Sequence, residues 1–379
     1  MENRIKNAVE QFEALLRQQL ARQERMEQSA PAKDFSGMQT VTVGLIDGDG
    51  IGPIIMKQAK RVLEKLLTDE ISAGRVVLKQ IDGLTIENRL ALGKAVPDDV
   101  LAEIKTCDVL LKGPTTTPKG GMMESANVTL RRELDLYANV RPVMVPEEGI
   151  DWIFFRENTE GEYALGSKGV ELPGELTMDF KVTTDAGTRR IAKAAFDYAR
   201  ANGKTSVAIV TKANIMKKTD GMFSRIAHEV AEGYPEITAE DWYIDIMTAN
   251  LVNPAVRSKF QVFLLPNLYG DIITDEAAQI QGGVGTAGSA NIGGQYAMFE
   301  AIHGSAPRKI EAGEGDYANP ASILKAAEMM LRHIAMTGKA EKLGKALAEC
   351  TESEKRVVVT GHRDGATCEA FTDYLLEKL

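Results

Sequence analysis

The sequence has few cysteines and no long hydrophobic segment. Its three cysteines, Cys107, Cys350 and Cys368, are too few for a disulfide framework and lack the spacing of a metal cluster, so they fit a reducing compartment. No apolar run is long enough to cross a membrane. Residues 1–30 lack the apolar core of a signal peptide, and their acidic residues are unlike a mitochondrial transit peptide. These absences predict a cytoplasmic protein without a membrane segment.

An excess of positive charge is also missing. The 379 residues carry a formal net charge of −9, which argues against general nucleic-acid binding. A hydrophobic content of 44% suits a globular chain of two or three domains with a sizeable core. The composition therefore indicates a globular protein that is not a general nucleic-acid binder.

Short apolar runs alternate with amphipathic stretches along most of the chain. This alternation predicts an α/β fold with a largely parallel sheet and with ligands at the carboxyl ends of strands. The predicted strands are 40–46, 76–81, 107–113, 152–157, 206–211, 243–247 and 261–266. The predicted helices are 53–67, 97–104, 187–202 and 219–233.

Two segments stand outside this alternation. Residues 1–30 predict one helix, because Ile5, Val9, Phe12, Leu16 and Leu20 recur at a helical interval on a charged surface. Such a helix would pack on its own domain or on a partner subunit. Residues 166–185 alternate as a strand does and have no helix attached, which predicts a projecting β arm that could serve as an interface.

Two glycine-containing turns each follow a predicted strand. GDGIGP at 48–53 is a near miss of the dinucleotide fingerprint, because position 53 is proline, and it is otherwise a tight turn into a helix. LKGPTTTPKGG at 111–121 offers hydroxyl and amide donors to an anion, or is a polar turn.

Several polar residues have spacings that suit chemistry. Asp271 and Asp275 lie four apart at the start of a helix, which suits Mg²⁺ or simple helix N-terminal acid enrichment. Lys212 closes a strand, where a lysine is either a desolvated base or a solvated surface residue. His303 follows a glycine-rich stretch, 282–294, and is either a ligand contact or structural.

The run SANVTLRRELDLYANVRP at 125–142 places three arginines in a segment that is otherwise helical and partly apolar. We interpret it as a helix that carries Arg131 and Arg132 and, a few turns on, Arg141. Arginines in an acidic chain raise the question of which anion they bind, because a guanidinium pairs with a carboxylate through two hydrogen bonds.

The motifs together resemble those of one enzyme family. GDGIGP, KGPTTTP, S-x-N-x-x-L-R, RENTEGEY, NLYGD-x-x-x-D and HGSAP occur in the order found in β-decarboxylating dehydrogenases that act on isocitrate, 3-isopropylmalate, homoisocitrate or tartrate. The resemblance runs from about residue 40 to the C-terminus and is greatest to NAD-linked isocitrate dehydrogenases. It implies a two-domain isocitrate/isopropylmalate dehydrogenase-like fold. The domains would be a large cofactor-binding domain, 37–136 with 282–379, a small substrate and dimerisation domain, 137–281, and an N-terminal helical extension, 1–36.

The resemblance assigns roles residue by residue. Substrate carboxylates would be bound by Arg131, Arg141 and Arg156, and the γ-carboxylate of isocitrate by Ser125 and Asn127. Tyr163 and Lys212 would be catalytic, and Asp245, Asp271 and Asp275 would bind Mg²⁺ or Mn²⁺. Lys212 and Asp245 would reach the site of a neighbouring subunit, which implies a homodimer or a higher homo-oligomer. The residues that match cofactor contacts are Thr116, Thr117, Asn214, His303, Gly304, Ser305, Ala306 and Asn319.

The expected reaction is oxidative decarboxylation of isocitrate to 2-oxoglutarate and CO₂ with NAD. NADP is the alternative, because Arg308 and Lys309 open a long loop, 308–318, where NAD-dependent relatives have an acid; Glu311 could supply that acid. The sequence is also compatible with a 3-isopropylmalate, homoisocitrate, tartrate or malate dehydrogenase, with a non-catalytic regulatory subunit, and with a simple phosphate-binding module.

Overall fold

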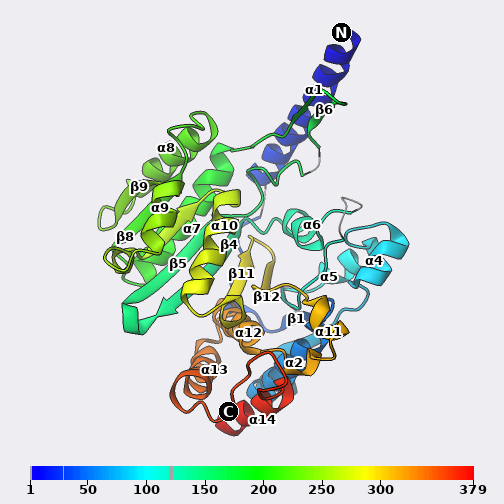
Figure 1. The fold of residues 1–379 in the computed structure, drawn as a ribbon, viewed down its shortest axis with the longest axis vertical. Helices are drawn as coiled ribbons and strands as arrows, with labels where there is room; N and C mark the ends of the chain where they lie inside the picture. The colour runs from blue at the N-terminus through cyan, green and yellow to red at the C-terminus, as the bar shows by residue number, and fades with distance from the viewer. Residues whose placement is uncertain (1, 29, 119–122, 167) are drawn as a thin grey trace. The chain divides into compact units, whose positions relative to one another are not determined.

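A computed structural model describes residues 2–28, 30–118, 123–166 and 168–379. The chain divides into two compact units. The first comprises Met1–Pro31 and Tyr137–Ala277, and the second comprises Ala32–Leu136 and Ala278–Leu379 (Figure 1). The domain boundaries predicted from the sequence stay a prediction beside these ranges. Lys119–Gly121 of the KGPTTTP region and Ser167 of the predicted arm lie outside the described residues.

The second unit contains a mostly parallel arrangement of strands in the order β2-β1-β3-β12-β11. β1 pairs in parallel with β2 and β3, β12 pairs in parallel with β3, and β11 pairs antiparallel with β12. The strands are β1 Val41–Ile46, β2 Val76–Gln80, β3 Val109–Lys112, β11 Gly288–Ile292 and β12 Ala297–Ala301. β3 and β12 are buried along their whole length, as a strand covered on both faces must be.

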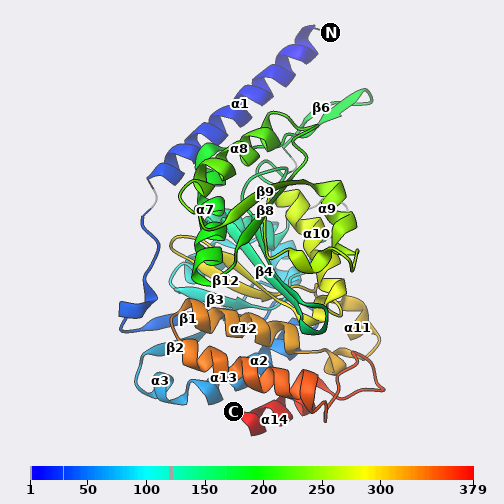
Figure 2. The ribbon, with the colours of Figure 1, turned by 90° about the vertical axis from the view of Figure 1, so that its left-hand side faces the viewer.

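Helices cover these strands. α12 packs on β11, β12 and α13, and α14 packs on α2 (Figure 2). The helices of this unit are α2 Gly52–Leu66, α3 Thr68–Ser72, α4 Ile86–Leu92, α5 Asp98–Ile104, α6 Ala126–Glu133, α11 Pro307–Glu311, α12 Ala321–His333, α13 Thr337–Ala348 and α14 Cys368–Lys378. Pro53 stands at the start of α2, where its fixed φ suits the first helical turn.

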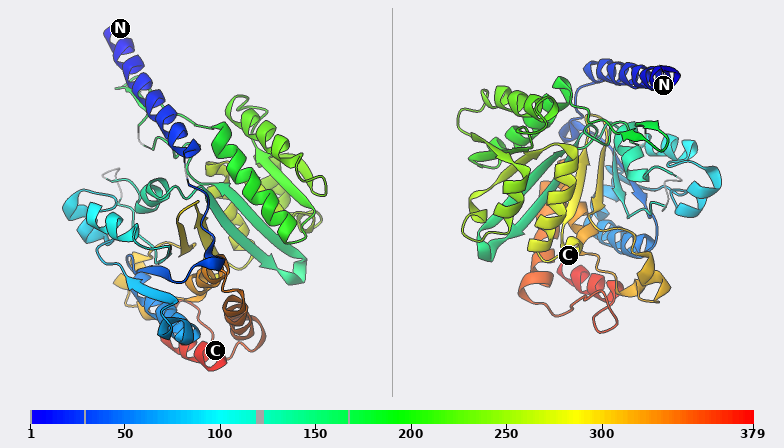
Figure 3. Two further views of the ribbon diagram at one scale, coloured as in Figure 1. Left: turned by 180° about the vertical axis from the view of Figure 1, so that it is seen from behind. Right: turned by 45° about the horizontal axis from the view of Figure 1, so that its top comes forward.

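The first unit contains strands in the order β4-β5-β10-β8-β9. β4 and β5 form an antiparallel pair, and β10, β8 and β9 follow in parallel. The strands are β4 Ala138–Val145, β5 Ile150–Glu157, β8 Ser206–Thr211, β9 Thr238–Tyr243 and β10 Val262–Leu265. The helices are α1 Glu2–Glu27, α7 Asp185–Ala201, α8 Thr219–Ala231, α9 Ile244–Leu251 and α10 Asn267–Ile280. α7 packs against β5, β10 and α8, and Figure 3 shows it lying along these strands.

The predicted β arm is a two-stranded hairpin of the first unit. β6 Val170–Leu172 pairs antiparallel with β7 Leu176–Met178. α1 contacts this hairpin and α7. The α/β class and the projecting arm predicted from the sequence are confirmed.

Two sequence predictions about local structure are wrong. Residues 243–247 were expected to form a strand, but β9 ends at Tyr243 and α9 begins at Ile244. The strand is the polar stretch before this run, whereas Met247 and Leu251, four apart, give α9 one buried face. The helix expected over 125–142 ends at Glu133, Asp135 takes a left-handed φ of 47°, and Arg141 lies on strand β4.

Within the described residues, no helix combines the length and the apolar character needed to cross a membrane. Cys107, Cys350 and Cys368 are all buried as free thiols.

Candidate active site

Three motifs that lie far apart in the sequence meet in the second unit. The Asp49 carboxylate of GDGIGP accepts hydrogen bonds from the backbone N–H groups of Thr116 and Ile86, both at 2.7 Å. The Thr116 and Ser305 hydroxyls are 2.6 Å apart, and the Ile51 N–H donates to the Ser305 carbonyl at 3.0 Å. Asp49 therefore holds the KGPTTTP loop, and the Ile51 N–H together with the Thr116 hydroxyl holds the HGSAP loop against the same turn.

Glycine is required in the GDGIGP turn because other backbone lies directly against it. Gly48 and Gly50 have φ of +72° and +59°. A Cβ on Gly50 would lie 2.0 Å from the Ser305 carbonyl oxygen, and one on Gly48 would lie 2.2 Å from that of Pro114. These glycines thus let neighbouring loops pack directly against the turn. In a dinucleotide fingerprint, by contrast, the glycines let the backbone come close to a phosphate group of the ligand.

The HGSAP loop has features that suit a bound cofactor. His303 Nδ1 lies 3.0 Å from the Gly304 carbonyl, whereas its Nε2 is buried with no hydrogen-bond partner in the described part of the chain. Burial lowers the pKa of His303, which favours a neutral ring. Ala306 has a left-handed φ of 45°, a conformation that an alanine adopts only where its surroundings impose it. An orphaned buried nitrogen beside a strained loop fits a nicotinamide nucleotide as the missing partner.

Most of the remaining predicted cofactor residues are more exposed than Ser305. Thr117, Gly304 and Asn214 are exposed or partly exposed, the last of them on the first unit. The Asn319 Oδ1 accepts a hydrogen bond from the Ala321 N–H at 2.9 Å, at the start of α12. The structure thus brings Thr116 and Ser305 together and holds Asn319 through its own helix.

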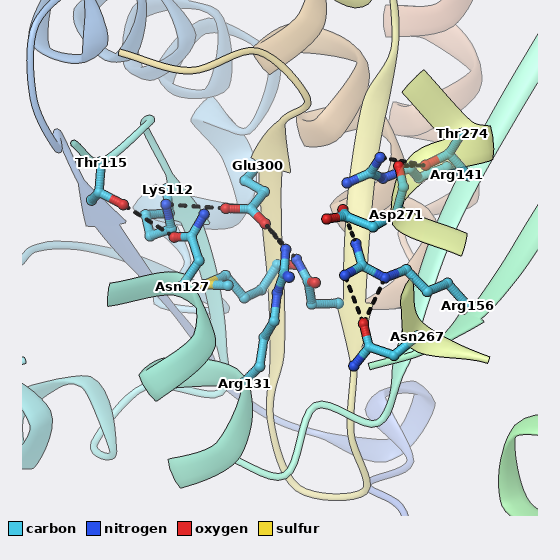
Figure 4. Close-up of polar contacts among 12 residues, drawn as sticks. Lys112, Thr115, Asn127, Arg131, Arg141, Arg156, Asn267, Asp271, Thr274 and Glu300 are labelled. Carbon is cyan, nitrogen blue, oxygen red and sulfur yellow. Dashed lines mark hydrogen bonds and ion pairs between the residues drawn. The ribbon is translucent and has the colours of Figure 1, made fainter. Parts of the chain in front are cut away.

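Arg131 belongs to a buried ionic cluster that sequence reasoning missed. Its Nη2 lies 3.2 Å from Glu300 Oε1, and Lys112 Nζ lies 3.0 Å from Glu300 Oε2 (Figure 4). The Asn291 amide also donates to Glu300, at 2.9 Å. Burial alone would raise the pKa of Glu300, but Lys112 and Arg131 lower it to about 2. One carboxylate therefore faces two cations, which leaves positive charge for a ligand anion.

Ser125 and Asn127 lie at the N-terminal end of α6, the helix that carries Arg131 in its last turn. Ser125 is the N-cap residue, yet its side chain makes no capping hydrogen bond. The Asn127 Oδ1 accepts from the Thr115 hydroxyl at 3.2 Å, which links it to the KGPTTTP loop (Figure 4). Arg132 faces outward and pairs with Glu124 through two contacts of 2.8 Å.

Arg156 is fully buried in the first unit. Its Nε and Nη2 donate to the Asn267 Oδ1 at 2.9 and 2.6 Å, and its Nη1 donates to the Asp271 Oδ1 at 2.5 Å (Figure 4). A Cβ on Gly270 would lie 2.5 Å from the Arg156 side chain, which explains the glycine of NLYGD. The guanidinium is therefore locked in one orientation before any ligand arrives.

The first unit contributes three more of the predicted site residues, namely Arg141, Asp271 and Asp275. The Tyr163 hydroxyl donates to the Asp271 Oδ2 at 2.7 Å. The Arg141 Nη1 donates to the Thr274 hydroxyl at 2.5 Å and lies 3.2 Å from the Asp275 Oδ1. Asp271 and Asp275 are 39% and 64% exposed in their side chains, whereas Arg141 and Arg156 are buried. Two accessible carboxylates on one helix face fit a hard divalent cation as part of an oxygen-ligand set.

The third predicted metal ligand, Asp245, does not join these two carboxylates. Within the described residues, no group of three or more His, Cys, Asp or Glu side chains is arranged to hold a metal ion. Asp245 instead pairs with Lys212, whose Nζ lies 2.5 Å from the Asp245 Oδ1. The hydrogen bond from Lys212 lowers the pKa of Asp245.

Asp220 fixes the strand end that carries Lys212. This fully buried carboxylate accepts a hydrogen bond from the Lys212 backbone N–H at 2.8 Å and pairs with Lys181 at 2.6 Å. The acid in TDG, residues 219–221, gave no functional signal in the sequence. Its burial makes it a positioning group for the lysine.

RENTEGEY contains a buried acidic pair next to Tyr163. The Glu157 carboxylate accepts from the N–H groups of Thr159 and Glu160 and from the Thr159 hydroxyl. Burial and the neighbouring Glu160 charge raise the pKa of Glu157 to about 7. The Asn267 amide donates to the Glu160 carbonyl at 3.0 Å, so the group that holds Arg156 also holds the loop leading to Tyr163.

The chain is similar to known dehydrogenases. The family model for isocitrate/isopropylmalate dehydrogenases matches residues 42–375. A Drosophila melanogaster protein named probable isocitrate dehydrogenase [NAD] subunit alpha, mitochondrial, is 37% identical over 355 residues, which cover 91% of this chain and 88% of that protein. An isocitrate dehydrogenase [NADP] from Rickettsia felis is 40% identical over 297 residues, covering 76% of this chain and 58% of that protein.

The similarity extends to solved structures. The crystal structure of isocitrate dehydrogenase from Methylococcus capsulatus matches with a TM-score of 0.79 and 34% identity, covering 89% of this chain and 99% of that one. The fold expected from the resemblance is confirmed. The prediction of a cytoplasmic location is wrong, because the Drosophila, Schizosaccharomyces pombe and Caenorhabditis elegans relatives are named mitochondrial. The few cysteines and the composition of residues 1–30, on which that prediction depended, therefore do not reveal the compartment.

Proposed function

The chain belongs to the isocitrate/isopropylmalate dehydrogenase family, and from this premise we propose that it oxidises and decarboxylates isocitrate to 2-oxoglutarate and CO₂. Relatives named isocitrate dehydrogenase at 36–38% identity over most of the chain support this substrate. Isocitrate has one carboxylate more than 3-isopropylmalate, malate or tartrate, and the polar residues Ser125 and Asn127 would bind it. A polar site of this kind rejects ligands that leave its hydrogen-bonding groups unpaired.

The observation that carries the proposal is the pairing of fixed cations with accessible carboxylates in the first unit. Arg141 and Arg156 are buried and held in place, while Asp271 and Asp275 expose part of their carboxylates beside them. This arrangement lets the arginines bind substrate carboxylates while the aspartates bind a cation on the same molecule. From the resemblance we propose that Arg131 also binds a substrate carboxylate.

The chemistry assigned to the chain's own residues follows from these contacts. When bound, a divalent metal would supply Lewis-acid polarisation of the substrate, and a nicotinamide nucleotide would supply the hydride acceptor. Lys212 would assist loss of the proton from the C2 hydroxyl, helped by the Asp245 carboxylate at 2.5 Å. Tyr163, whose hydroxyl is already a donor to Asp271, would deliver the proton to C3 after CO₂ leaves.

A homodimer is part of the proposal. Lys212 and Asp245 stand on a surface where large apolar side chains are exposed, namely Ile215, Met216, Tyr243 and Ile246. Such a patch marks a protein interface. A partner subunit on this patch would receive Lys212 and Asp245, and Asp245 would become a third carboxylate beside Asp271 and Asp275 of that partner's site.

The proposed cofactor is NAD. Of the two basic residues that open the 308–318 loop, Lys309 donates its ammonium group to the Gly361 carbonyl, so it already has a partner. Glu314 lies in the same loop and accepts from His362 at 3.1 Å. If this loop meets the adenosine ribose, as the resemblance implies, a 2′-phosphate would add negative charge to a loop that already contains Glu314, which favours NAD over NADP.

A substrate panel tests the proposed activity. The purified chain is assayed with isocitrate, 3-isopropylmalate, homoisocitrate, malate and tartrate, each with NAD and NADP, with Mg²⁺ or Mn²⁺ and after chelation. We expect the highest kcat/KM for isocitrate with NAD and loss of turnover after chelation. A preference for 3-isopropylmalate, or full turnover without metal, would contradict the assignment.

Hybrid dimers test the shared site. Lys212→Met and Asp271→Asn should each inactivate the homodimer. If Lys212 acts in the partner's site, each hybrid keeps one intact site, so random mixing restores about one quarter of wild-type activity. The matched mixture of Lys212→Met with Asp245→Asn places both defects in the same half-site and should restore none. Equal activity in the two mixtures would refute the exchange of Lys212.

A further inference from the structure

α1 presents three different faces. One face packs on its own unit: Arg4 pairs with Glu175 at 2.8 Å, the Gln11 amide donates to the Gly169 carbonyl, and Arg22 donates to Glu160 at 3.1 Å. Leu15 is buried on this face. These contacts fix the helix along the β6–β7 hairpin and α7 (Figures 1 and 2).

A second face is apolar and exposed. At about 100° per residue it is centred about 120° from the packed face. Its members are between 45% and 58% exposed, and they are Ile5, Val9, Phe12, Leu16 and Leu20. A helix that served only its own unit would place its large apolar residues on the packed face. Phe12 also contacts Phe180 of its own unit, with ring centroids 5.3 Å apart, yet 45% of its side chain stays exposed. The area that stays exposed on this face therefore needs a further partner.

The third face is polar, and its charged side chains pair with one another. Lys6 and Glu10 form an i,i+4 pair, and so do Glu13 and Arg17. Among residues 2–27 five acidic and five basic residues cancel. A helix that lies on a membrane surface is normally rich in Lys and Arg on its polar face. The balanced charge of α1 argues against lipid as the partner.

The spacing of the apolar face favours another helix. Steps of four, three, four and four residues average 3.75, close to the roughly 3.6 residues of one helical turn, so the five side chains form one narrow stripe along a straight helix. The stripe is also symmetric about a point next to Phe12. Ile5 and Leu20 lie equally far on either side of this point, and so do Val9 and Leu16. Two copies related by a two-fold axis at that point would place Ile5 against Leu20, Val9 against Leu16 and Phe12 against Phe12. Such self-complementarity is the requirement of an isologous interface.

We propose that the exposed apolar face of α1 binds the same face of α1 in a second copy of this chain, with the two helices antiparallel. Each of the five side chains exposes about half of the roughly 200 Å² of a large apolar residue, so the pair would bury roughly 1,000 Å². That area reaches the lower bound of a specific interface. The proposal is independent of the proposed enzymatic activity.

Disulfide trapping in the full-length chain tests this contact. In Val9→Cys/Leu16→Cys, the two thiols of one helix are about 10.5 Å apart along the axis, so they cannot join within a chain. The matched control, Glu10→Cys/Arg17→Cys, has the same spacing on the polar face. The three native cysteines are buried, which keeps the background low.

Under mild oxidation we expect the first variant to form a covalent dimer quantitatively at micromolar concentration and the control to stay monomeric in denaturing gels. Adding Phe12→Glu to the first variant places two carboxylates on the two-fold axis and should suppress the cross-link at unchanged helix content. Equal cross-linking of both variants, or none in either, would overturn the proposal. Co-sedimentation of the wild-type chain with phosphatidylcholine/phosphatidylserine vesicles would also overturn it, because lipid would then be the occupant.

Discussion

Arg156 gives the sharpest test of how the site is built. Arg156→Lys keeps the positive charge but replaces a planar fork with a single ammonium. The wild-type guanidinium donates twice to the Asn267 Oδ1 and once to the Asp271 Oδ1. A lysine can keep about one of these contacts, and the shorter head group leaves space beside Gly270.

The expected loss follows from burial. Hydrogen bonds to charged groups contribute about 1.5–3 kcal/mol each, and the two that end on Asn267 share an acceptor, so we expect about 2–4 kcal/mol in total. The control is Arg132→Lys, which changes the same residue type at a side chain that is 41% exposed and paired with Glu124. An exposed pair contributes below about 1 kcal/mol.

Thermal unfolding at one fixed protein concentration compares the two variants. At about 2–4 °C per kcal/mol, Arg156→Lys should unfold roughly 4–16 °C below wild type and Arg132→Lys less than about 4 °C below it. The kcat/KM for isocitrate should fall strongly only in Arg156→Lys. Equal melting temperatures and equal kinetics in the two variants would refute the reasoning.

Three further predictions follow from single side chains. Ser125→Glu should lower kcat/KM for isocitrate far more than Ser125→Ala, because glutamate places a like charge beside a substrate carboxylate. With malate as substrate, the kcat/KM values of the two variants should differ much less. Equal effects of the two substitutions on isocitrate would show that Ser125 does not face the substrate. Asp275→Asn should weaken the Mg²⁺ dependence of activity, measured as the metal concentration for half-maximal rate, because a ligand charge is lost; an unchanged metal titration would contradict its role. The pKa of Glu157 is raised from an ordinary 4.5 to about 7, so its protonation stabilises the folded state fully below pH 4.5, and this stabilisation is lost as the pH rises to about 7. Between pH 5 and 8 the melting temperature of Glu157→Gln should therefore fall less than that of wild type. Parallel curves of melting temperature against pH would contradict the raised pKa of the buried acid.

The sequence predicted the elements whose pattern is set by local burial. β3 and β10 are short apolar runs buried along their length, and α7 has apolar residues at helical spacing. The error at 243–247 arose because an apolar run of five residues fits a strand or a helix, and only the buried spacing of Met247 and Leu251 decides between them. The error at Arg141 arose because Asp135 ends the helix with a left-handed backbone that its residue type does not announce.

Parts of the candidate site could not be predicted from the sequence alone. Lys112 and Glu300 lie at the ends of two apolar strands, where each looked like an ordinary charged residue, and only β3–β12 pairing places Glu300 beside Lys112. The partnership of Arg156 with Asn267 depends on residues 111 positions apart. Motif resemblance predicted a role for Arg156 but not the contact with Asn267 that orients it, because orienting contacts are made across the fold.

Product stoichiometry is the most direct test of the central claim. The purified chain alone is supplied with isocitrate, NAD and Mn²⁺, and NADH, CO₂ and 2-oxoglutarate are measured in the same reaction. The account predicts the three products in equal amounts. NADH without CO₂, or no turnover by the chain until another subunit is added, would contradict it.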